Sequence, residues 1–187
     1  MSVKSRVSEI LYELVNNQAY LNDEQLNKMI EAISNANHIF TAGAGRSGVA
    51  IRAFTNRLMH LGFSVSNIGE ITTPHSAPGD LLVIGSGSGE TESLISLAKK
   101  AQKSGVEVAV ITMDENSTIA KMAKVAVVLP GVSPKLKNKG IDITSAQPMG
   151  SAFEQMMFLT YDGIIMELME RMGQTSEEMF LRHADFE

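Results

Sequence analysis

The feature that most constrains this chain is a regular alternation of short apolar segments with longer amphipathic ones. Five apolar segments between residues 38 and 129 resemble buried strands, and most are separated by segments with helical periodicity. Strands that alternate with helices form right-handed β-α-β units, in which helices cover both faces of a parallel sheet. We therefore predict an α/β fold, a three-layer α-β-α sandwich around a five-stranded, doubly wound parallel sheet of order 2-1-3-4-5. The predicted strands are 38–43, 64–68, 80–86, 107–112 and 125–129, and the predicted helices between them are 48–61, 91–104 and 117–122.

Helical patterns flank this region at both ends of the chain. Two amphipathic helices are predicted over residues 5–19 and 22–33, and a long helix over 149–172 follows a loop rich in Gly, Pro, Ser and Lys. No repeat or linker interrupts the pattern. We therefore predict one domain over 1–187, with N-terminal helices in 1–36, the sheet core in 37–147, and C-terminal helices and a tail in 148–187.

The long helix has more apolar surface than one sheet can cover. Its sequence FEQMMFLTYDGIIMELM is apolar around much of its circumference, and seven of the twelve methionines lie in the last forty residues. Methionine packs adaptably in cores and at interfaces. The pattern predicts a homo-oligomer.

Composition excludes several classes of protein. The net charge is −5, and the basic cluster Lys135, Lys137 and Lys139 lies among turn residues without aromatics, so we expect a solvated loop and no nucleic-acid partner. The chain has no cysteine, which excludes disulfides and thiolate metal sites and is compatible with a reducing compartment. Glu9 and Glu13 interrupt the first apolar run, so we expect no membrane partner and a cytoplasmic protein.

The segment TAGAGRSGVA follows the first predicted strand and contains a dinucleotide-type glycine pattern. Gly43, Gly45 and Gly48 have G-x-G-x-x-G spacing, and Glu70 lies near the position where such sites carry an acidic residue. The position of Arg46 within the turn argues against dinucleotide binding. A guanidinium favours a terminal phosphate monoester over a diphosphate bridge, which backbone amides mainly hold.

A second glycine loop, SGSGET, follows the third predicted strand and also enters a helix. A flexible turn with a serine or threonine helix cap is the alternative reading. In the predicted strand order, however, both glycine loops border the crevice between strands one and three, where open α/β sheets bind ligands. The predicted phosphate ligands are Gly45, Arg46, Ser47, Ser86, Gly87, Ser88, Gly89, Glu90 and Thr91.

With these loops the chain resembles the sugar isomerase (SIS) domain family. The segments RLMHLGF, QPMGSAFE and LRHADFE extend the resemblance to its 6-phospho-3-hexuloisomerase branch along nearly the whole chain. The resemblance implies interconversion of D-arabino-hex-3-ulose 6-phosphate and D-fructose 6-phosphate in formaldehyde fixation by the ribulose monophosphate pathway. It also implies that no metal or organic cofactor takes part, that the protein is a homotetramer, and that 3-hexulose-6-phosphate synthase is its pathway neighbour.

Moving a carbonyl from C3 to C2 requires proton transfer through an enediolate, which one carboxylate can perform. Glu154, near the start of the long helix, is the candidate. From the sequence alone, Glu154 is better interpreted as a solvated helix carboxylate. The resemblance of PMGSAFE to the family favours a catalytic residue instead. His60 and His183 are candidates for a second acid or base, whereas we expect His38 and His75 to be structural. Thirteen helical residues separate Ser47 from His60, about 20 Å, so His60 is expected to act only in a neighbouring subunit's site.

Three alternatives remain open at this point. A nucleotide-dependent oxidoreductase is favoured only by the G-x-G-x-x-G pattern and Glu70. A sugar-phosphate sensor without catalysis would use the same fold. Other SIS isomerases act on arabinose 5-phosphate or sedoheptulose 7-phosphate, and sugar length depends on side chains that the sequence does not place.

Overall fold

The structure is a computed structural model that describes residues 2–134, 136, 141 and 143–185. Five parallel strands form one sheet in the order β2-β1-β3-β4-β5, which confirms the predicted order. Each strand lies within a predicted strand and is equal to it or up to two residues shorter. The strands are β1 (Ile39–Gly43), β2 (Val65–Asn67), β3 (Leu81–Gly85), β4 (Glu107–Thr112) and β5 (Val125–Val128).

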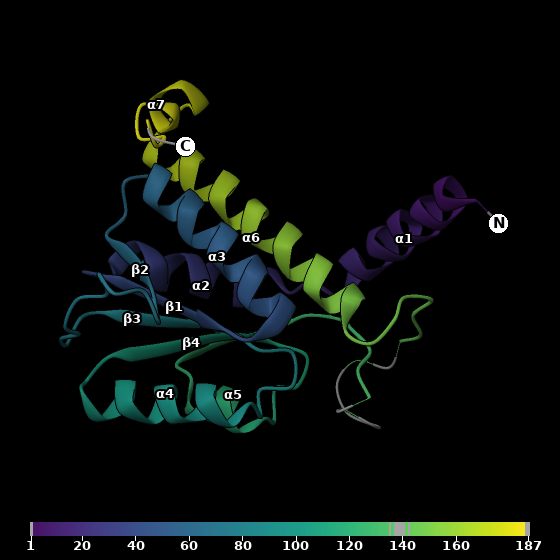
Figure 1. Ribbon diagram of the computed structural model, residues 1–187, viewed down its shortest axis with the longest axis horizontal. Coiled ribbons are helices and arrows are strands. Elements are labelled where there is room, and N and C mark those ends of the chain that lie inside the picture. The colour runs from purple at the N-terminus through teal and green to yellow at the C-terminus, as the bar shows by residue number, and fades with distance from the viewer. Residues whose placement is uncertain (1, 135, 137–140, 142, 186–187) are drawn as a thin grey trace.

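Helices cover both faces of the sheet, so the three-layer sandwich is also confirmed (Figure 1). One face carries α4 (Glu92–Lys103) and α5 (Thr118–Met122), and the other carries α2 (Asp23–Asn35), α3 (Gly45–His60) and α6 (Ser151–Met172). Because strand side chains alternate between faces, Leu82 packs in the core beneath α4, whereas Leu81 and Val83 belong to the core beneath α2, α3 and α6. Each face of the sheet thus has its own apolar layer.

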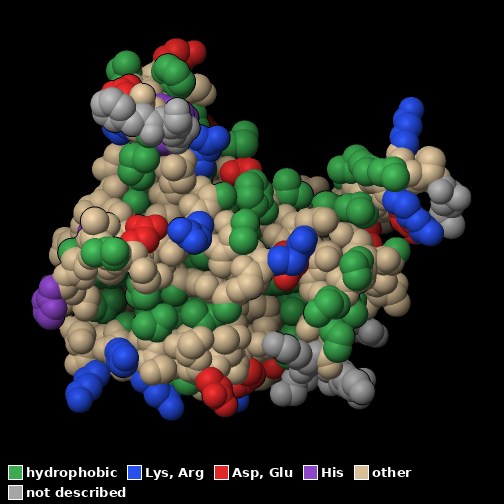
Figure 2. Space-filling model, viewed as in Figure 1, with side chains coloured by type: hydrophobic (Ala, Val, Ile, Leu, Met, Phe, Trp, Pro, Cys, Tyr) green, Lys and Arg blue, Asp and Glu red, His purple; other side chains and the backbone are tan. Residues whose placement is uncertain are grey.

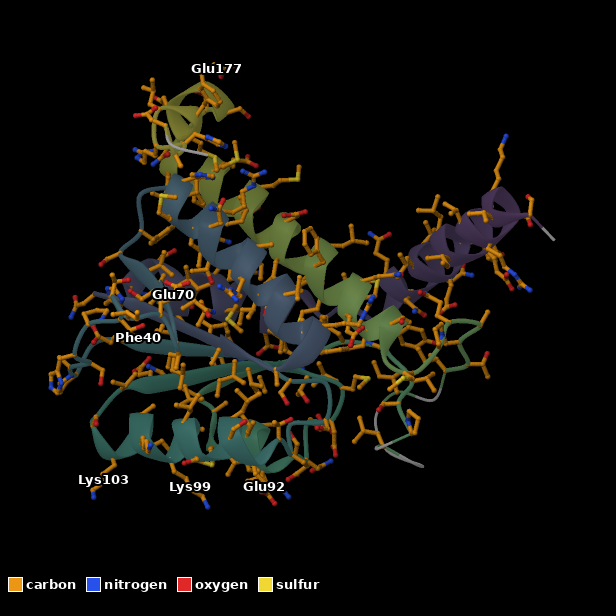
Figure 3. The ribbon with its side chains drawn as sticks, in the orientation of Figure 1. Phe40, Glu70, Glu92, Lys99, Lys103 and Glu177 are labelled. Carbon is orange, nitrogen blue, oxygen red and sulfur yellow. The ribbon has the colours of Figure 1, made fainter. Side chains whose placement is uncertain are left out.

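The outer surface of α4 is charged. Glu92, Lys99 and Lys103 point away from the sheet, while Phe40 lies on the sheet itself, within the core beneath α4 (Figure 3). This division between a polar and an apolar side is what the helical periodicity of 91–104 predicts.

The N-terminal helix α1 (Val3–Asn17) projects from the body of the molecule (Figure 1). It packs mainly on α6, and only Leu14 and Asn17 of its side chains are buried. A short 3-10 turn, η1 (Gln18–Tyr20), connects it to α2, and α7 (Ser176–Phe180) follows α6. Within the described residues, no helix is both long and apolar enough to cross a membrane.

Helix α1 begins at Val3 and helix α3 at Gly45, two and three residues earlier than the sequence pattern predicts. Helix α3 starts at Gly45 instead of residue 48, so Gly45, Arg46 and Ser47 form its first turn. The basic cluster Lys135, Lys137 and Lys139, predicted to be a solvated loop, lies outside the described residues.

Candidate functional site

The first wall of the site is the turn from β1 into α3. Gly43 and Gly48 pack backbone against backbone, since a Cβ added at Gly48 would lie 2.8 Å from the Gly43 carbonyl oxygen. Gly45 has φ +57, a left-handed conformation that glycine adopts without strain. The glycine pattern therefore has a packing reason here: it brings the first turn of α3 close to the end of β1.

The second wall is the loop from β3 into α4. The Gly89 amide donates to the Ser86 hydroxyl oxygen at 3.2 Å, which closes the loop on itself. A Cβ at Gly89 would lie 2.1 Å from the Ser117 Oγ, and the Glu90 carboxylate accepts a hydrogen bond of 2.7 Å from the Thr118 amide at the start of α5. Gly89 and Glu90 thus contact α5, whereas the rest of the loop is left for the site.

The third wall comes from the segment before α6 and from its first turn. The three walls enclose a cavity of about 700 Å³. Seven of the nine predicted phosphate ligands line it, and so does the candidate base Glu154. The seven are Gly45, Arg46, Ser47, Ser86, Gly87, Ser88 and Thr91; Gly89 and Glu90 do not line it. The expectation that both glycine loops border one crevice between β1 and β3 is confirmed.

Three helix N-termini at this cavity lack side-chain caps. Helices α3, α4 and α6 begin after Ala44, Thr91 and Gly150, and none of these residues caps its helix with a side-chain hydrogen bond. In the described part of the chain, the other four α-helices are all capped, by Ser2, Asn22, Ser117 and Thr175. Uncapped first-turn amides and the positive ends of helix dipoles favour a bound anion.

Arg46 and Glu154 come from two walls of the cavity and contact each other directly. The Arg46 Nε donates to the Glu154 carboxylate in an ion pair between α3 and α6. The Arg46 side chain is 66% exposed and the Glu154 side chain only 20%. The carboxylate therefore lies inside the cavity, and the guanidinium can reach both the carboxylate and an anion entering from solvent.

Gly85 also lines the cavity, although the sequence did not single it out, and it packs against side chains of α6. Gly85 ends β3, and a Cβ there would lie 3.1 Å from the Tyr161 hydroxyl and 3.2 Å from the Met157 sulfur. Tyr161 stacks on Phe54 with ring centroids 4.3 Å apart, and burial raises the pKa of its hydroxyl, so the ring stays neutral. This packing fixes the distance between α6 and the end of β3.

Further lining residues come from the segment that the sequence describes only as a long loop. Ser133, Pro134 and Pro148 of this segment line the cavity, together with Met113, Ser151 and Phe153 from outside it. The Gly, Pro and Ser content of residues 130–148 is the one signal that marks this segment as special, because functional loops are often long.

The two histidine candidates lie away from this cavity and close to each other. His60 is the last residue of α3, and its ring stacks on His183 with centroids 5.4 Å apart. Arg182 donates to the His60 carbonyl oxygen at 2.9 Å, which holds the C-terminal segment on the end of α3. Neither histidine lines the cavity of its own subunit.

Glu70, the acidic residue that a dinucleotide-binding site would use, also lies away from the cavity. Glu70 follows β2 (Figure 3), and its carboxylate lies 4.0 Å from the guanidinium of Arg52, an exposed residue of α3. Of the described residues, no three His, Asp or Glu side chains gather in a way that would hold a metal ion.

Comparison with known proteins agrees with this architecture. Residues 32–159 match the SIS domain family. The chain belongs to this family. The 3-hexulose-6-phosphate isomerase of Bacillus subtilis is 47% identical over the full length of both chains, and that of Mycobacterium gastri is 33% identical over 99% of this chain and 92% of its own.

A solved structure extends the comparison to three dimensions. A Methanococcus jannaschii protein, whose crystal structure was taken to infer a function of 3-hexulose-6-phosphate isomerase, superposes with a TM-score of 0.83. It is 32% identical, and the alignment covers 98% of this chain and 99% of that one. The SIS domain of this chain thus has full-length relatives named as isomerases.

Proposed function

We propose that this SIS protein is a sugar-phosphate isomerase that interconverts D-arabino-hex-3-ulose 6-phosphate and D-fructose 6-phosphate. One observation carries the proposal: three uncapped helix N-termini and the Arg46–Glu154 pair surround a single cavity. The full-length similarity to isomerases of that name supports the choice of substrate.

The phosphate of the sugar occupies the space between α3 and α4. Backbone amides of both first turns donate to its oxygens, together with the hydroxyls of Ser47, Ser86 and Ser88. Arg46 contributes a charge-assisted hydrogen bond from the exposed side. A terminal phosphate, with three oxygens and two negative charges, matches this set of donors.

The reacting carbons then lie towards α6, next to Glu154. The carboxylate takes the proton from C2, which gives a 2,3-enediolate, and returns a proton to C3 on the same face. A proton also has to leave O2 and reach O3. His60 and His183, which lie outside the cavity of their own subunit, perform this transfer in the site of a neighbouring subunit.

The partner that brings these histidines is a second copy of the chain in a homotetramer. An apolar groove of about 730 Å³ lies between α1, α2 and α6, and apolar side chains cover the exposed face of α1 and part of α6 (Figure 2). Leu11 and Val15 of α1 themselves line the groove, so the groove and the exposed apolar face form one surface that a second copy can cover. The exposed apolar residues of α1 and α6 are Val3, Val7, Leu11, Tyr12, Val15, Phe158, Leu159, Met166 and Met172.

In the cell, 3-hexulose-6-phosphate synthase supplies the substrate from ribulose 5-phosphate and formaldehyde, in the cytoplasmic ribulose monophosphate pathway. The decisive test is a coupled assay in which the synthase generates the hexulose phosphate and fructose 6-phosphate is measured. Arabinose 5-phosphate and sedoheptulose 7-phosphate, offered in parallel, test the other isomerase activities. Thermal stabilisation by NAD(P) but not by fructose 6-phosphate would contradict the proposal and support an oxidoreductase.

A further inference from the structure

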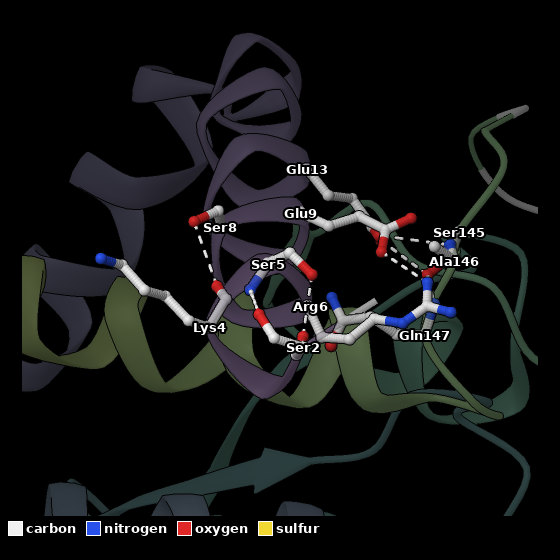
Figure 4. Close-up of polar contacts among 10 residues, drawn as sticks. All are labelled: Ser2, Lys4, Ser5, Arg6, Ser8, Glu9, Glu13, Ser145, Ala146 and Gln147. Carbon is white, nitrogen blue, oxygen red and sulfur yellow. Dashed lines mark hydrogen bonds and ion pairs between the residues drawn. The ribbon is translucent and has the colours of Figure 1, made fainter.

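A single carboxylate connects the projecting helix α1 to the segment that leads into the third wall of the cavity. The Ser145 hydroxyl donates to Glu13 Oε1 at 2.6 Å, and the Ala146 amide donates to Glu13 Oε2 at 3.3 Å (Figure 4). Glu13 and Ser145 are both half-buried, which strengthens a charge-assisted hydrogen bond compared with one fully in water.

The contact continues from Ser145 to the cavity. The Gln147 amide donates to the Ser145 hydroxyl oxygen at 3.0 Å, and the Gln147 side chain is buried. Pro148, Met149 and Gly150 follow and line the cavity, and the Glu154 amide donates to the Gly150 carbonyl oxygen at 3.0 Å. Glu13 is therefore connected through a short series of bonds to the turn that carries the candidate base.

The backbone of this wall contains a residue in an unfavourable conformation, which its surroundings have to stabilise. Met149 has φ +56 and is the only non-glycine residue with a positive φ in the described part of the chain. A left-handed conformation costs a residue of this type about 1–3 kcal/mol, so it persists where the surroundings fix it. The Glu13 carboxylate fixes the chain three residues before it.

We propose that Glu13 is a positioning residue for catalysis, which acts by holding the Ser145–Gln147 segment and through it the placement of Glu154. The inference rests on the isomerase activity proposed above. It assigns α1 a function beyond covering α6: the position of this helix determines the geometry of the wall that carries the base. The phosphate walls on α3 and α4 have no bond to Glu13 and keep their geometry when it is changed.

The test compares Glu13→Ala, Glu13→Gln and Ser145→Ala with the matched control Glu9→Gln. Glu9 lies one turn earlier on α1 and pairs with exposed Arg6 at 2.8 Å. We expect Glu13→Ala to lower kcat about ten- to a hundredfold, because small misplacements of a base are costly. Its KM and its inhibition by inorganic phosphate should remain within about twofold of wild type, and Glu9→Gln should resemble wild type in every measurement. Glu13→Gln retains an acceptor for the Ser145 hydroxyl and should recover part of the loss.

The double variant Glu13→Ala/Ser145→Ala should be no slower than the slower single variant, because both changes break one connection. A wild-type kcat in Glu13→Ala, or a loss equal to that of Glu9→Gln, would overturn the inference. So would a loss that appears as a higher KM for the sugar phosphate at unchanged kcat.

A second measurement does not depend on the reaction. Hydrogen exchange of the peptide covering residues 143–150 should be faster in Glu13→Ala than in wild type, with the peptide covering 86–92 unchanged as the internal reference. Unchanged exchange at 143–150 would overturn the inference even if the activity falls. If wild type itself does not turn over the hexulose phosphate, the proposed function fails, whereas faster exchange would still establish the structural connection.

Discussion

The Arg46 guanidinium donates to the Glu154 carboxylate, although 108 residues separate the two in the chain. The pair joins the first turns of α3 and α6, and both residues line the cavity that the two glycine loops border. It brings together a cation suited to a phosphate and a carboxylate suited to proton transfer.

Replacing Glu154 with Gln should remove turnover and preserve binding. The amide has the shape of the carboxylate but cannot accept the C2 proton, so we expect kcat to fall by about a hundred- to ten-thousandfold. Fructose 6-phosphate should still stabilise the variant in a thermal-shift measurement, since the phosphate donors are unchanged. A near-normal kcat would show that Glu154 is not the base.

Replacing Arg46 with Ala should mainly weaken substrate binding. Loss of a charge-assisted hydrogen bond corresponds to about a ten- to hundredfold rise in KM, and inorganic phosphate should become a weaker inhibitor. Arg52→Ala is the matched control, because Arg52 lies on the same helix, is equally exposed and faces Glu70. Equal effects of the two substitutions would mean that Arg46 acts only through the net charge.

Replacing Gly48 with Ala should destabilise the protein. The added Cβ would lie 2.8 Å from the Gly43 carbonyl oxygen. Its neighbours are all backbone atoms of Gly43, so no flexible side chain can move aside. We expect a loss of about 1–3 kcal/mol in the free energy of unfolding, measured by denaturant titration. An unchanged unfolding midpoint would show that α3 and β1 can separate without cost.

Mixed oligomers test whether the histidines act in a neighbouring subunit. His60→Ala and Glu154→Gln should each be nearly inactive alone. If one site combines residues of two subunits, about a quarter of the sites in an equal mixture of co-assembled chains retain both groups, and activity should return to that extent. The control is the same mixture with His75→Ala, a substitution in an exposed loop, in place of His60→Ala. No recovery would exclude His60 from a neighbour's site.

Replacing Leu11 with Glu should disrupt assembly. Leu11 lines the groove beside α6 and is exposed in the single chain, so a charge there opposes burial against a second copy. Sedimentation should show a smaller species than wild type. Ile71→Glu is the control, because Ile71 is fully exposed and lies outside the groove. A wild-type sedimentation coefficient for Leu11→Glu would show that this groove is not the interface.

The sequence by itself determined the order of elements and the three layers, and with the common strand order of such sheets it placed the crevice between β1 and β3. These properties follow from the spacing of apolar residues and from turn residues, which act over a few positions, and from the constraints that parallel sheets impose on connections. The same local signals placed both glycine loops at the cavity. Of the nine loop residues predicted as phosphate ligands, seven line it.

Only the tertiary structure decided which way individual side chains face. Gly89 and Glu90 belong to the SGSGET motif, yet they contact α5, because Ser117 and the Thr118 amide lie beside them. The Arg46–Glu154 pair and the bonds of Glu13 to the Ser145 segment join residues more than a hundred positions apart. Such contacts depend on how complete helices pack, and a local pattern carries no information about them.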